Sequence, residues 1–429
     1  MKKNYYCWYI LGACCLMISG GMGFYRYTSG LFFTPVAEEF GVGMTAMGSL
    51  QTIQGLAGLL SVPFVAKAIS GKNIGRVIAL VAAIHCVAVA TLSYSHSVLH
   101  WGIVSFITGL CGSFIYMTPT PLLLARWFKK AQGTVIGFAM LFTGLSGAIA
   151  TSFLNAVIES CGWRTAIGAS AAATALLMIP VALFVVRSDP AEMGLLPYGA
   201  TEVDVCEERD KMKTEVPNGG GREKFFEDVQ TRNMFIILMT TLVLMGYGSS
   251  YTPFFTSFAL EQGFSSSQGA RLASFLMIGT ALWKLIIGYL NDRIGTRRST
   301  YLSLSVGMIG FLLVIFFKSI RILYFAGLLC GIHQALGALQ PPLIAKEIFG
   351  MRLFSKYLAY ITAISTVVGA LGSGIIGVIY DSTSSYIPGF WLGVVVLAFT
   401  AVGMVLTLRY KSKTGYNPSP MRKDLTYGS

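Results

Sequence analysis

The stretch WRTAIGASAAATALLMIPVALFVVRSDPAEMGLLPYG, residues 163–199, joins a long apolar run to a polar break that contains proline and glycine. The charged residues of the apolar part, Arg164 and Arg187, stand at its two ends. An α-helix rises about 1.5 Å per residue, so about 20 predominantly apolar residues cross the hydrocarbon core of a bilayer. We therefore predict a membrane-spanning helix over 163–187, followed by a polar connection.

Similar apolar runs fill most of the chain. Of its 429 residues, 54% are hydrophobic and 12% are charged, and the mean hydropathy is +0.65, whereas a typical soluble domain has about 25% charged residues. The runs lack the two-residue alternation of barrel strands, so they are expected to be helices. The sequence predicts an all-α membrane protein with about 12 transmembrane helices, near 8–35, 45–69, 76–95, 98–124, 133–157, 163–187, 232–258, 267–290, 299–317, 320–345, 355–380 and 387–409.

Positive charges orient these helices. If the N-terminus and every second loop are cytoplasmic, that side receives Lys2, Lys3, Lys72, Arg76, Arg126, Lys129, Lys130, Arg187, Arg293, Arg297, Arg298, Lys346, Arg352, Lys356, Arg409 and Lys411. The opposite side receives Arg164, Arg271, Lys318 and Arg321. Because positive residues concentrate in cytoplasmic loops, we expect a multi-pass protein of a cell membrane, a bacterial inner membrane or a plasma membrane, with both termini cytoplasmic.

The same topology accounts for the net charge of +13. Basic loops are attracted to anionic membrane lipid, so no nucleic-acid partner is needed to explain the charge. The N-terminus runs straight into a span that is too long for a signal-peptide core. We therefore expect the first helix to be retained.

The predicted spans form two sets of about six. Hydrophobicity is low between Arg187 and Arg232, which predicts a six-helix bundle over 1–187, a cytoplasmic linker over 188–231, a second six-helix bundle over 232–410 and a cytoplasmic tail over 411–429. The halves are similar, since YTSGLFFTPVAEEFG at 27–41 matches YTPFFTSFALEQGF at 251–264. Two six-helix repeats with substrate held near the midplane are a recurring plan of transporters.

Several motifs resemble one family of transporters. The segment GYLNDRIGTRR at 288–298 matches the major facilitator superfamily's loop after the eighth span, and RWFKKAQGTVIG at 126–137 resembles the entry to the fifth span in monocarboxylate transporters. The segments CGWR at 161–164, DPAEMGLLPYG at 189–199 and KEIFGMRLF at 346–354 are similar to boundary motifs of bacterial members. The chain thus resembles the monocarboxylate transporter family and its bacterial oxalate/formate-exchanger relatives, which implies transport by alternating access.

One loop departs from that pattern. The segment SGKNIGR after the second span has Lys72 where the superfamily's loop carries an acid. The resemblance implies a gating role for the intact copy, Asp292 with Arg293, in locking one state. The alternative is that Asp292 simply caps a helix end in solvent.

Two cations lie deep in the predicted spans. Arg26 is roughly 13 Å from the outer end of the first helix, and Lys284 is roughly 12 Å from the cytoplasmic end of the eighth. No Asp or Glu lies deep in any predicted span, and a buried charge is costly unless it faces a cavity or a partner. An anionic substrate would neutralise both, because Arg presents a planar fork to a carboxylate and Lys a compact charge.

The resemblance places functional residues at the same two positions. Monocarboxylate transporters carry a functional Lys near the place of Arg26 and a substrate-binding Arg at the place of Lys284, so both residue types are exchanged here. They also have an acid for proton coupling where this chain has Thr280, which puts proton coupling by that route in doubt.

Weaker candidates are polar side chains inside the predicted spans. As substrate-contacting groups we name Tyr27, Tyr116, Thr280, Tyr247, Tyr251 and Gln340, and as a possible proton carrier His333. For the tyrosines the alternative is packing or gating, and for His333 it is a packed interhelical histidine. His333 and Gln340 share a helix face at i and i+7. His85 is expected to pack against a neighbouring helix or lie near lipid.

These features predict a secondary transporter of a small organic anion, a monocarboxylate, working by exchange or by proton-coupled symport. The alternatives are an oxalate/formate-type dicarboxylate exchanger and a membrane sensor that binds a carboxylate without moving it. An enzyme is not expected, because no acid/base or metal cluster converges at one depth. There is no phosphate-binding G-x-x-x-x-G-K-[ST] loop, no cofactor is expected and no oligomer is implied.

Overall fold

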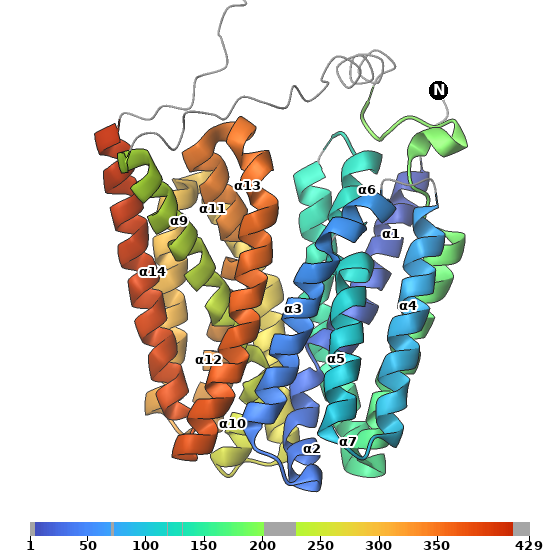
Figure 1. The fold of residues 1–429 in the computed structure, drawn as a ribbon, viewed down its shortest axis with the longest axis vertical. Coiled ribbons are helices and arrows are strands. Elements are labelled where there is room, and N and C mark those ends of the chain that lie inside the picture. Colours follow the sequence, from blue (N-terminus) through green and yellow to red (C-terminus); the bar gives the residue numbers. More distant parts are fainter. Residues whose placement is uncertain (1–4, 70–72, 118, 131, 201–228, 415–429) are drawn as a thin grey trace, which may run out of the picture.

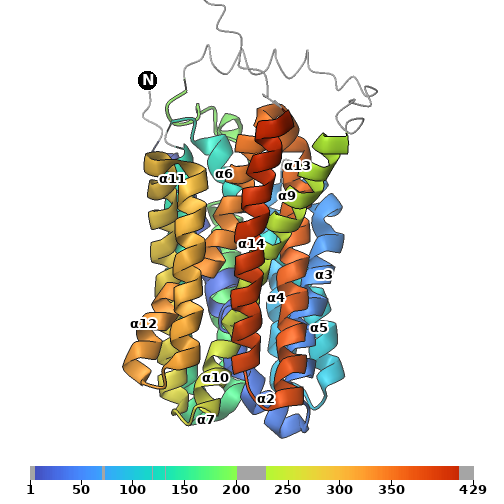
Figure 2. The ribbon, with the colours of Figure 1, turned by 90° about the vertical axis from the view of Figure 1, so that its left-hand side faces the viewer.

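The computed structural model describes residues 5–69, 73–117, 119–130, 132–200 and 229–414. Within these ranges, side chains are described except at 62, 63, 66–69, 116, 117, 132, 133, 229–235, 292, 342, 345–364, 366 and 408–414. Long helices run side by side along one axis (Figures 1 and 2). The described chain begins at Tyr5 and finishes at Thr414 at the same end of the molecule, here called the terminal end. The opposite end, where α2 and α10 lie, is called the distal end.

The first half contains the helices up to residue 184. They are α1 (Tyr6–Ile18), η1 (Ser19–Arg26), η2 (Ser29–Phe32), α2 (Phe33–Phe40), α3 (Met44–Ile69), α4 (Ile74–Thr91), η3 (Leu92–Tyr94), α5 (Val98–Gly112), η4 (Ser113–Met117), α6 (Pro119–Trp127) and α7 (Gln132–Phe184). A short turn of 3₁₀-helix, η5 (Pro190–Met193), follows. The long α7 turns at Gly162, whose φ of 81° is a left-handed conformation that glycine adopts without strain.

The second half repeats this arrangement. Its helices are α9 (Val229–Tyr247), η7 (Gly248–Phe254), α10 (Phe255–Glu261), α11 (Ser266–Phe316), α12 (Ile320–Cys330), α13 (Ile332–Thr383) and α14 (Ile387–Thr414). The long α11 turns at Gly295, with a φ of 80°. In both halves the first helix is interrupted near its middle, at η1 and at η7. The predicted all-α membrane fold is confirmed.

Eight helices of the described part are long and apolar enough to cross a membrane. One of them, Thr134–Phe184, contains two of the predicted spans. The predicted spans 45–69, 232–258 and 355–380 are not among the eight, and each runs over side chains that the structure does not describe.

The halves meet through polar contacts at the distal end. Asp381, near the end of α13, accepts hydrogen bonds from the backbone N–H groups of Met44 and Thr45 at the start of α3, both at 2.8 Å. Ser266, at the start of α11, donates to Asn155 of α7 at 2.9 Å. Each half therefore bonds to the first turn of a helix that belongs to the other half, and the distal end is closed.

The segment after α7 folds back onto the first half. Tyr198 forms a backbone bridge with Phe128, with its N–H donating to the carbonyl of Trp127 at 2.8 Å. The indole N–H of Trp127 in turn donates to the carbonyl of Arg187 at 3.1 Å. The first residues of the predicted linker, as far as Ala200, are thus attached to the terminal end of the first half.

Candidate functional site

Arg26 lies at the end of η1, a π-helical segment over SGGMGFYR. Its glycines allow close contact with α7, because a Cβ on Gly20 would come within 2.9 Å of Met178 and one on Gly23 would overlap Ser146. The wider π turn is followed by the tighter 3₁₀ turn of η2. π turns inside α-helices are frequent at functional sites, and this one determines which way Arg26 faces.

The guanidinium of Arg26 is held by two buried glutamines of α3. Its Nη1 donates to Oε1 of Gln51 at 2.9 Å and also to Oε1 of Gln54. Each of these glutamine side chains is 7% exposed. The Gln51 amide donates onward to Ser29 at 3.0 Å, and the Gln54 amide to Thr108 at 3.2 Å. The oxygen of each amide therefore points at the arginine and the nitrogen away from it.

No carboxylate of the first half can neutralise Arg26. The sequence has three acids before residue 188, Glu38, Glu39 and Glu159. Even Glu38 is twelve residues further along the chain, roughly 18 Å of helical rise. Glu39 is already bonded to Arg164 at 2.7 Å, at the distal end. The positive charge of Arg26 is thus bonded to neutral amides and remains uncompensated within this half.

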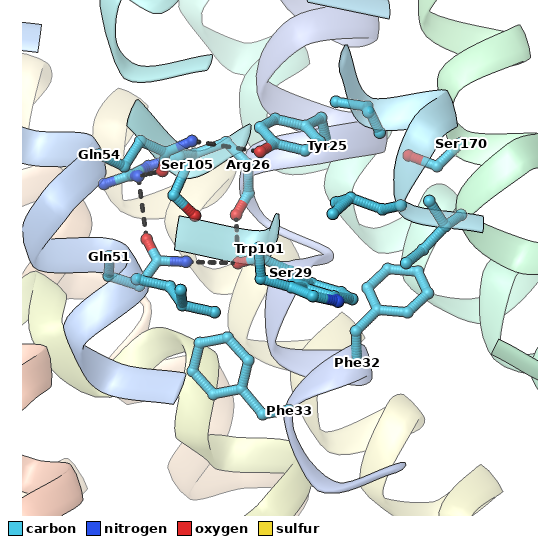
Figure 3. A pocket seen from close by; sticks show the side chains of 14 residues that line it. Tyr25, Arg26, Ser29, Phe32, Phe33, Gln51, Gln54, Trp101, Ser105 and Ser170 are labelled. Atoms are coloured by element: carbon cyan, nitrogen blue, oxygen red, sulfur yellow. Dashed lines mark hydrogen bonds between the residues drawn. The ribbon is translucent and has the colours of Figure 1, made fainter. Parts of the chain in front are cut away.

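Arg26 borders a pocket inside the first half (Figure 3). The empty space between the atoms of this pocket is about 550 Å³, a volume that includes open solvent at its mouth. Its lining combines apolar and polar side chains: Tyr25, Arg26, Ser29, Phe32, Phe33, Leu50, Gln51, Gln54, Val89, Leu92, Trp101, Ser105, Ile167 and Ser170. All of these residues belong to first-half elements, namely η1, η2, α2, α3, α4, η3, α5 and α7.

Lys284 occupies a separate place, at the contact between α11 and α7. Its side chain is 9% exposed, and its Nζ donates to the hydroxyl of Thr143 at 2.6 Å. The two helices are close here because Gly144 has no side chain: a Cβ at that position would overlap the carbonyl of Met277 and lie 2.8 Å from Ala281. Lys284 is therefore a buried cation, and its described hydrogen-bond partner is neutral, as are those of the partly buried Arg26. It does not line the Arg26 pocket, and convergence of both cations on one ligand stays a prediction.

Two predicted contact residues lie in other surroundings. Thr280 is fully buried and donates to the carbonyls of Leu276 and Gly331, at 3.0 and 3.2 Å. Tyr27 is partly buried and packs near Gly147, whose Cβ would lie 3.4 Å from its ring. Neither residue lines the pocket that contains Arg26.

The predicted aromatic candidates of the second half form one buried cluster. The rings of Tyr247 and Tyr251 are 5.7 Å apart, and the hydroxyl of Tyr251 donates to the carbonyl of Gly389 at 2.8 Å. His333, 3% exposed, stacks on Phe311 at 4.2 Å. This arrangement is typical of interhelical packing, and the proton-carrier role of His333 stays a prediction.

The remaining candidates lie toward the terminal end of the second half. Gln340 is fully buried, and its amide approaches Ser299 at 3.4 Å and Asn291 at 3.5 Å. The guanidinium of Arg293 lies 5.4 Å from the ring centre of Tyr289. The side chains of the predicted gate Asp292 and of Tyr116 lie outside the described part of the chain.

Sequence reasoning missed the two glutamines of α3, whereas one of the two environments expected for His85 is the one observed. Gln51 and Gln54 are spaced i, i+3 in an otherwise apolar stretch, SLQTIQGLAG, and that spacing puts both on one helix face. His85 is fully buried with its ring against the edge of Tyr25, 4.6 Å away. Helix packing was one of the two environments expected for His85. Its contact with Tyr25, the residue before Arg26, was not predicted.

The comparisons with known proteins agree with the fold. Residues 12–283 and 236–425 match the model of the Major Facilitator Superfamily. The chain therefore belongs to that superfamily.

Two relatives resemble the chain at low identity. Human monocarboxylate transporter 12 is 23% identical over 335 residues, covering 72% of this chain and 62% of the relative. The cis,cis-muconate transport protein of Acinetobacter baylyi is 23% identical over 279 residues, covering 62% of this chain and 63% of the relative. The matched part thus spans less than two thirds of either relative.

Solved structures confirm the fold alone, because their identities are low. A bacterial homolog of the human lysosomal transporter Spinster, in an inward-facing and unoccupied conformation, has a TM-score of 0.72 at 15% identity and covers 97% of this chain and 100% of that one. The nucleoside transporter NupG has a TM-score of 0.67 at 12% identity, with coverage of 96% and 100%.

Proposed function

We propose that this protein moves a small organic anion, a monocarboxylate, across the membrane by alternating access. The observation that carries the proposal is the state of Arg26: a partly buried guanidinium that borders a pocket and is bonded to two neutral amides. A cation in a membrane interior is costly unless something compensates its charge. A bound carboxylate would do so, and the fork of an arginine matches both carboxylate oxygens.

Lys284 supports the same proposal from the other half. Its described partner is a hydroxyl of the opposite half, so a negative ligand near this contact would be attracted to both halves. The resemblance to monocarboxylate transporters agrees with an acid as substrate. Exchange for another anion and symport with a proton both fit these observations.

A dicarboxylate is the second candidate. Two cations, the partly buried Arg26 and the buried Lys284, can neutralise two carboxylates. One relative is a muconate transport protein. A dicarboxylate that spans from Arg26 to Lys284 would need both residues, whereas a monocarboxylate held at Arg26 would depend less on Lys284. The variants Arg26→Gln and Lys284→Gln, described next, distinguish the monocarboxylate from the dicarboxylate.

The test is ligand-dependent thermal stabilisation of the purified protein with acetate, propionate, benzoate, oxalate and cis,cis-muconate, since a ligand that prefers the folded state raises its stability. A charge-assisted contact contributes roughly 1.5–3 kcal/mol. Arg26→Gln should therefore raise the dissociation constant of the ligand about ten- to a hundredfold. Arg26→Lys should also weaken binding, because the planar fork is lost. Lys284→Gln should weaken a dicarboxylate more than a monocarboxylate.

Matched controls are available on the surface. Arg271 and Lys318 are exposed, so Arg271→Gln and Lys318→Gln remove the same charges without touching the interior and should leave affinity unchanged. Counterflow of labelled ligand in proteoliposomes separates a transporter from a sensor, which would bind without exchange. Wild-type affinity in Arg26→Gln, or a preference for uncharged ligands, would refute the proposal.

A further inference from the structure

The two glutamines use a defined part of the Arg26 guanidinium. Arginine has five N–H donors, two on each terminal nitrogen and one on Nε. Both carboxamide oxygens accept from the same nitrogen, Nη1. Among the described residues, no hydrogen bond is made by Nη2 or by Nε. The edge that carries Nε and Nη2 therefore keeps two parallel donors.

We propose that Gln51 and Gln54 are positioning residues that form a neutral clamp. The clamp occupies Nη1 and presents the Nε–Nη2 edge of Arg26 to one carboxylate group, bound side-on by two hydrogen bonds. This inference rests on the proposed function and adds to it the residues that orient the anion-binding group. It also states how the ligand's carboxylate is held.

The orientation of the clamp is fixed by its own hydrogen bonds. The Gln51 nitrogen donates to Ser29, whose hydroxyl donates to the backbone carbonyl of Arg26 at 2.9 Å. The Gln54 nitrogen donates to Thr108, which also accepts from the hydroxyl of Tyr25 at 3.0 Å. With the nitrogens so engaged, the oxygens are directed at Arg26, and flipping either amide would place N–H groups against a cation.

The neutrality of the clamp matters as much as its geometry. A glutamate at either position has nearly the same shape as glutamine, but it would form an ion pair with Arg26 and remove the charge that attracts the ligand. Amide oxygens satisfy two donors of the guanidinium and leave its full charge in place. The pair thus meets two opposed requirements, since a partly buried guanidinium needs hydrogen-bond acceptors and an anion site needs a net positive charge.

A purely structural role makes a different prediction. If the glutamines simply satisfy the hydrogen bonds of Arg26, Gln54→Met should lower the melting temperature and leave ligand affinity unchanged, because the charge of Arg26 is kept. The experiment therefore compares Gln51→Glu, Gln54→Glu and the neutral, similarly sized Gln54→Met. Gln268→Glu is the control for an added negative charge, since Gln268 caps the start of α11 and glutamate serves equally in that capping box.

Two quantities are measured for each variant: the melting temperature without ligand, and the dissociation constant for the tightest of acetate, propionate and benzoate. We expect either Glu variant to weaken binding at least tenfold while the ligand-free protein remains folded. Gln54→Met keeps the charge of Arg26 but removes one of the two amides that orient it. We therefore expect the dissociation constant to rise three- to tenfold. Gln268→Glu should bind as the wild type does.

The outcomes separate this inference from the proposed function. If the wild type binds a carboxylate through Arg26 but both Glu variants keep wild-type affinity, the clamp is refuted and the proposed function stands. If the wild type binds no carboxylate, both fail together. Should a Glu variant not fold, the Met variant decides, because wild-type affinity in Gln54→Met would also refute the clamp.

Discussion

Asp381 should act as a latch that keeps the distal end closed. Its two carboxylate oxygens accept from the N–H groups of Met44 and Thr45, at 2.8 Å each. These are unsatisfied donors of the first turn of α3, where the helix dipole also favours a negative charge. Gly43 is required beside them, because a Cβ there would overlap the carboxylate. Opening the distal end must break both bonds.

The size of the effect follows from these contacts. A charge-assisted hydrogen bond contributes roughly 1.5–3 kcal/mol when buried, but Asp381 is exposed and water replaces part of what is lost. Capping interactions of exposed helix ends are worth about 1 kcal/mol, so two of them across the halves give roughly 1–2 kcal/mol, a factor of about 5–30 in an equilibrium. Asp381→Ala should therefore increase the distal-open population by about that factor.

The assay is the distance between spin labels on cysteines that replace His96 and Lys318. Both positions are exposed in distal loops of opposite halves, and the exposed Cys161 would first be changed to Ser. Asp381→Ala should transfer population to the longer distance. Ser382→Ala, which removes a bond inside the same helix, serves as the control. An unchanged distance distribution in Asp381→Ala would show that the carboxylate does not hold the halves together.

Three further predictions concern packing, gating and coupling. Gly144→Val should force α7 and α11 apart and destabilise the protein by about 1–3 kcal/mol, measured as a lower melting temperature; an unchanged value would mean that the helices have room to separate there. Asp292→Asn should slow transport with little change in ligand affinity, and equal losses of both would count against gating. Because position 280 is a threonine and not an acid, transport should depend weakly on an imposed proton gradient and should be stimulated by anion on the far side of the membrane. If transport instead depended strictly on the proton gradient, and His333→Gln abolished that dependence, His333 would be the proton carrier.

The sequence was sufficient for the fold because crossing a bilayer imposes a length and a composition on every span. Counting residues along a helix also gives a depth for Arg26 in its span, and that depth stays a prediction. The sequence could not give the direction of that side chain. Assigning residues to a helix face assumes a rotation of 100° per residue. The first helix changes from α to π at Ser19 and to 3₁₀ at Ser29, so that assumption fails at Arg26.

The polar partners could be predicted in part. The i, i+7 spacing of His333 and Gln340 predicts a shared face, and both do contact α11, at Phe311 and at Ser299. Which helix stands opposite that face depends on tertiary packing, which no local pattern encodes. Gln51 and Gln54 are visible as a polar pair in an apolar span, but their role depends on Arg26, a residue of another helix.

The confinement of the Arg26 pocket to one half has a thermodynamic consequence. A ligand shifts a conformational equilibrium only to the extent that it binds one state more tightly than the other. An anion held entirely by the first half would move with it as a rigid body and would have the same affinity before and after the halves rearrange. To promote the rearrangement it must gain or lose a contact with the second half, and Lys284, whose described bond already crosses between α11 and α7, is placed to provide that difference. Under the proposed function, we expect Arg26 to set how tightly the anion is held and Lys284 to set how strongly anion binding drives the exchange of states.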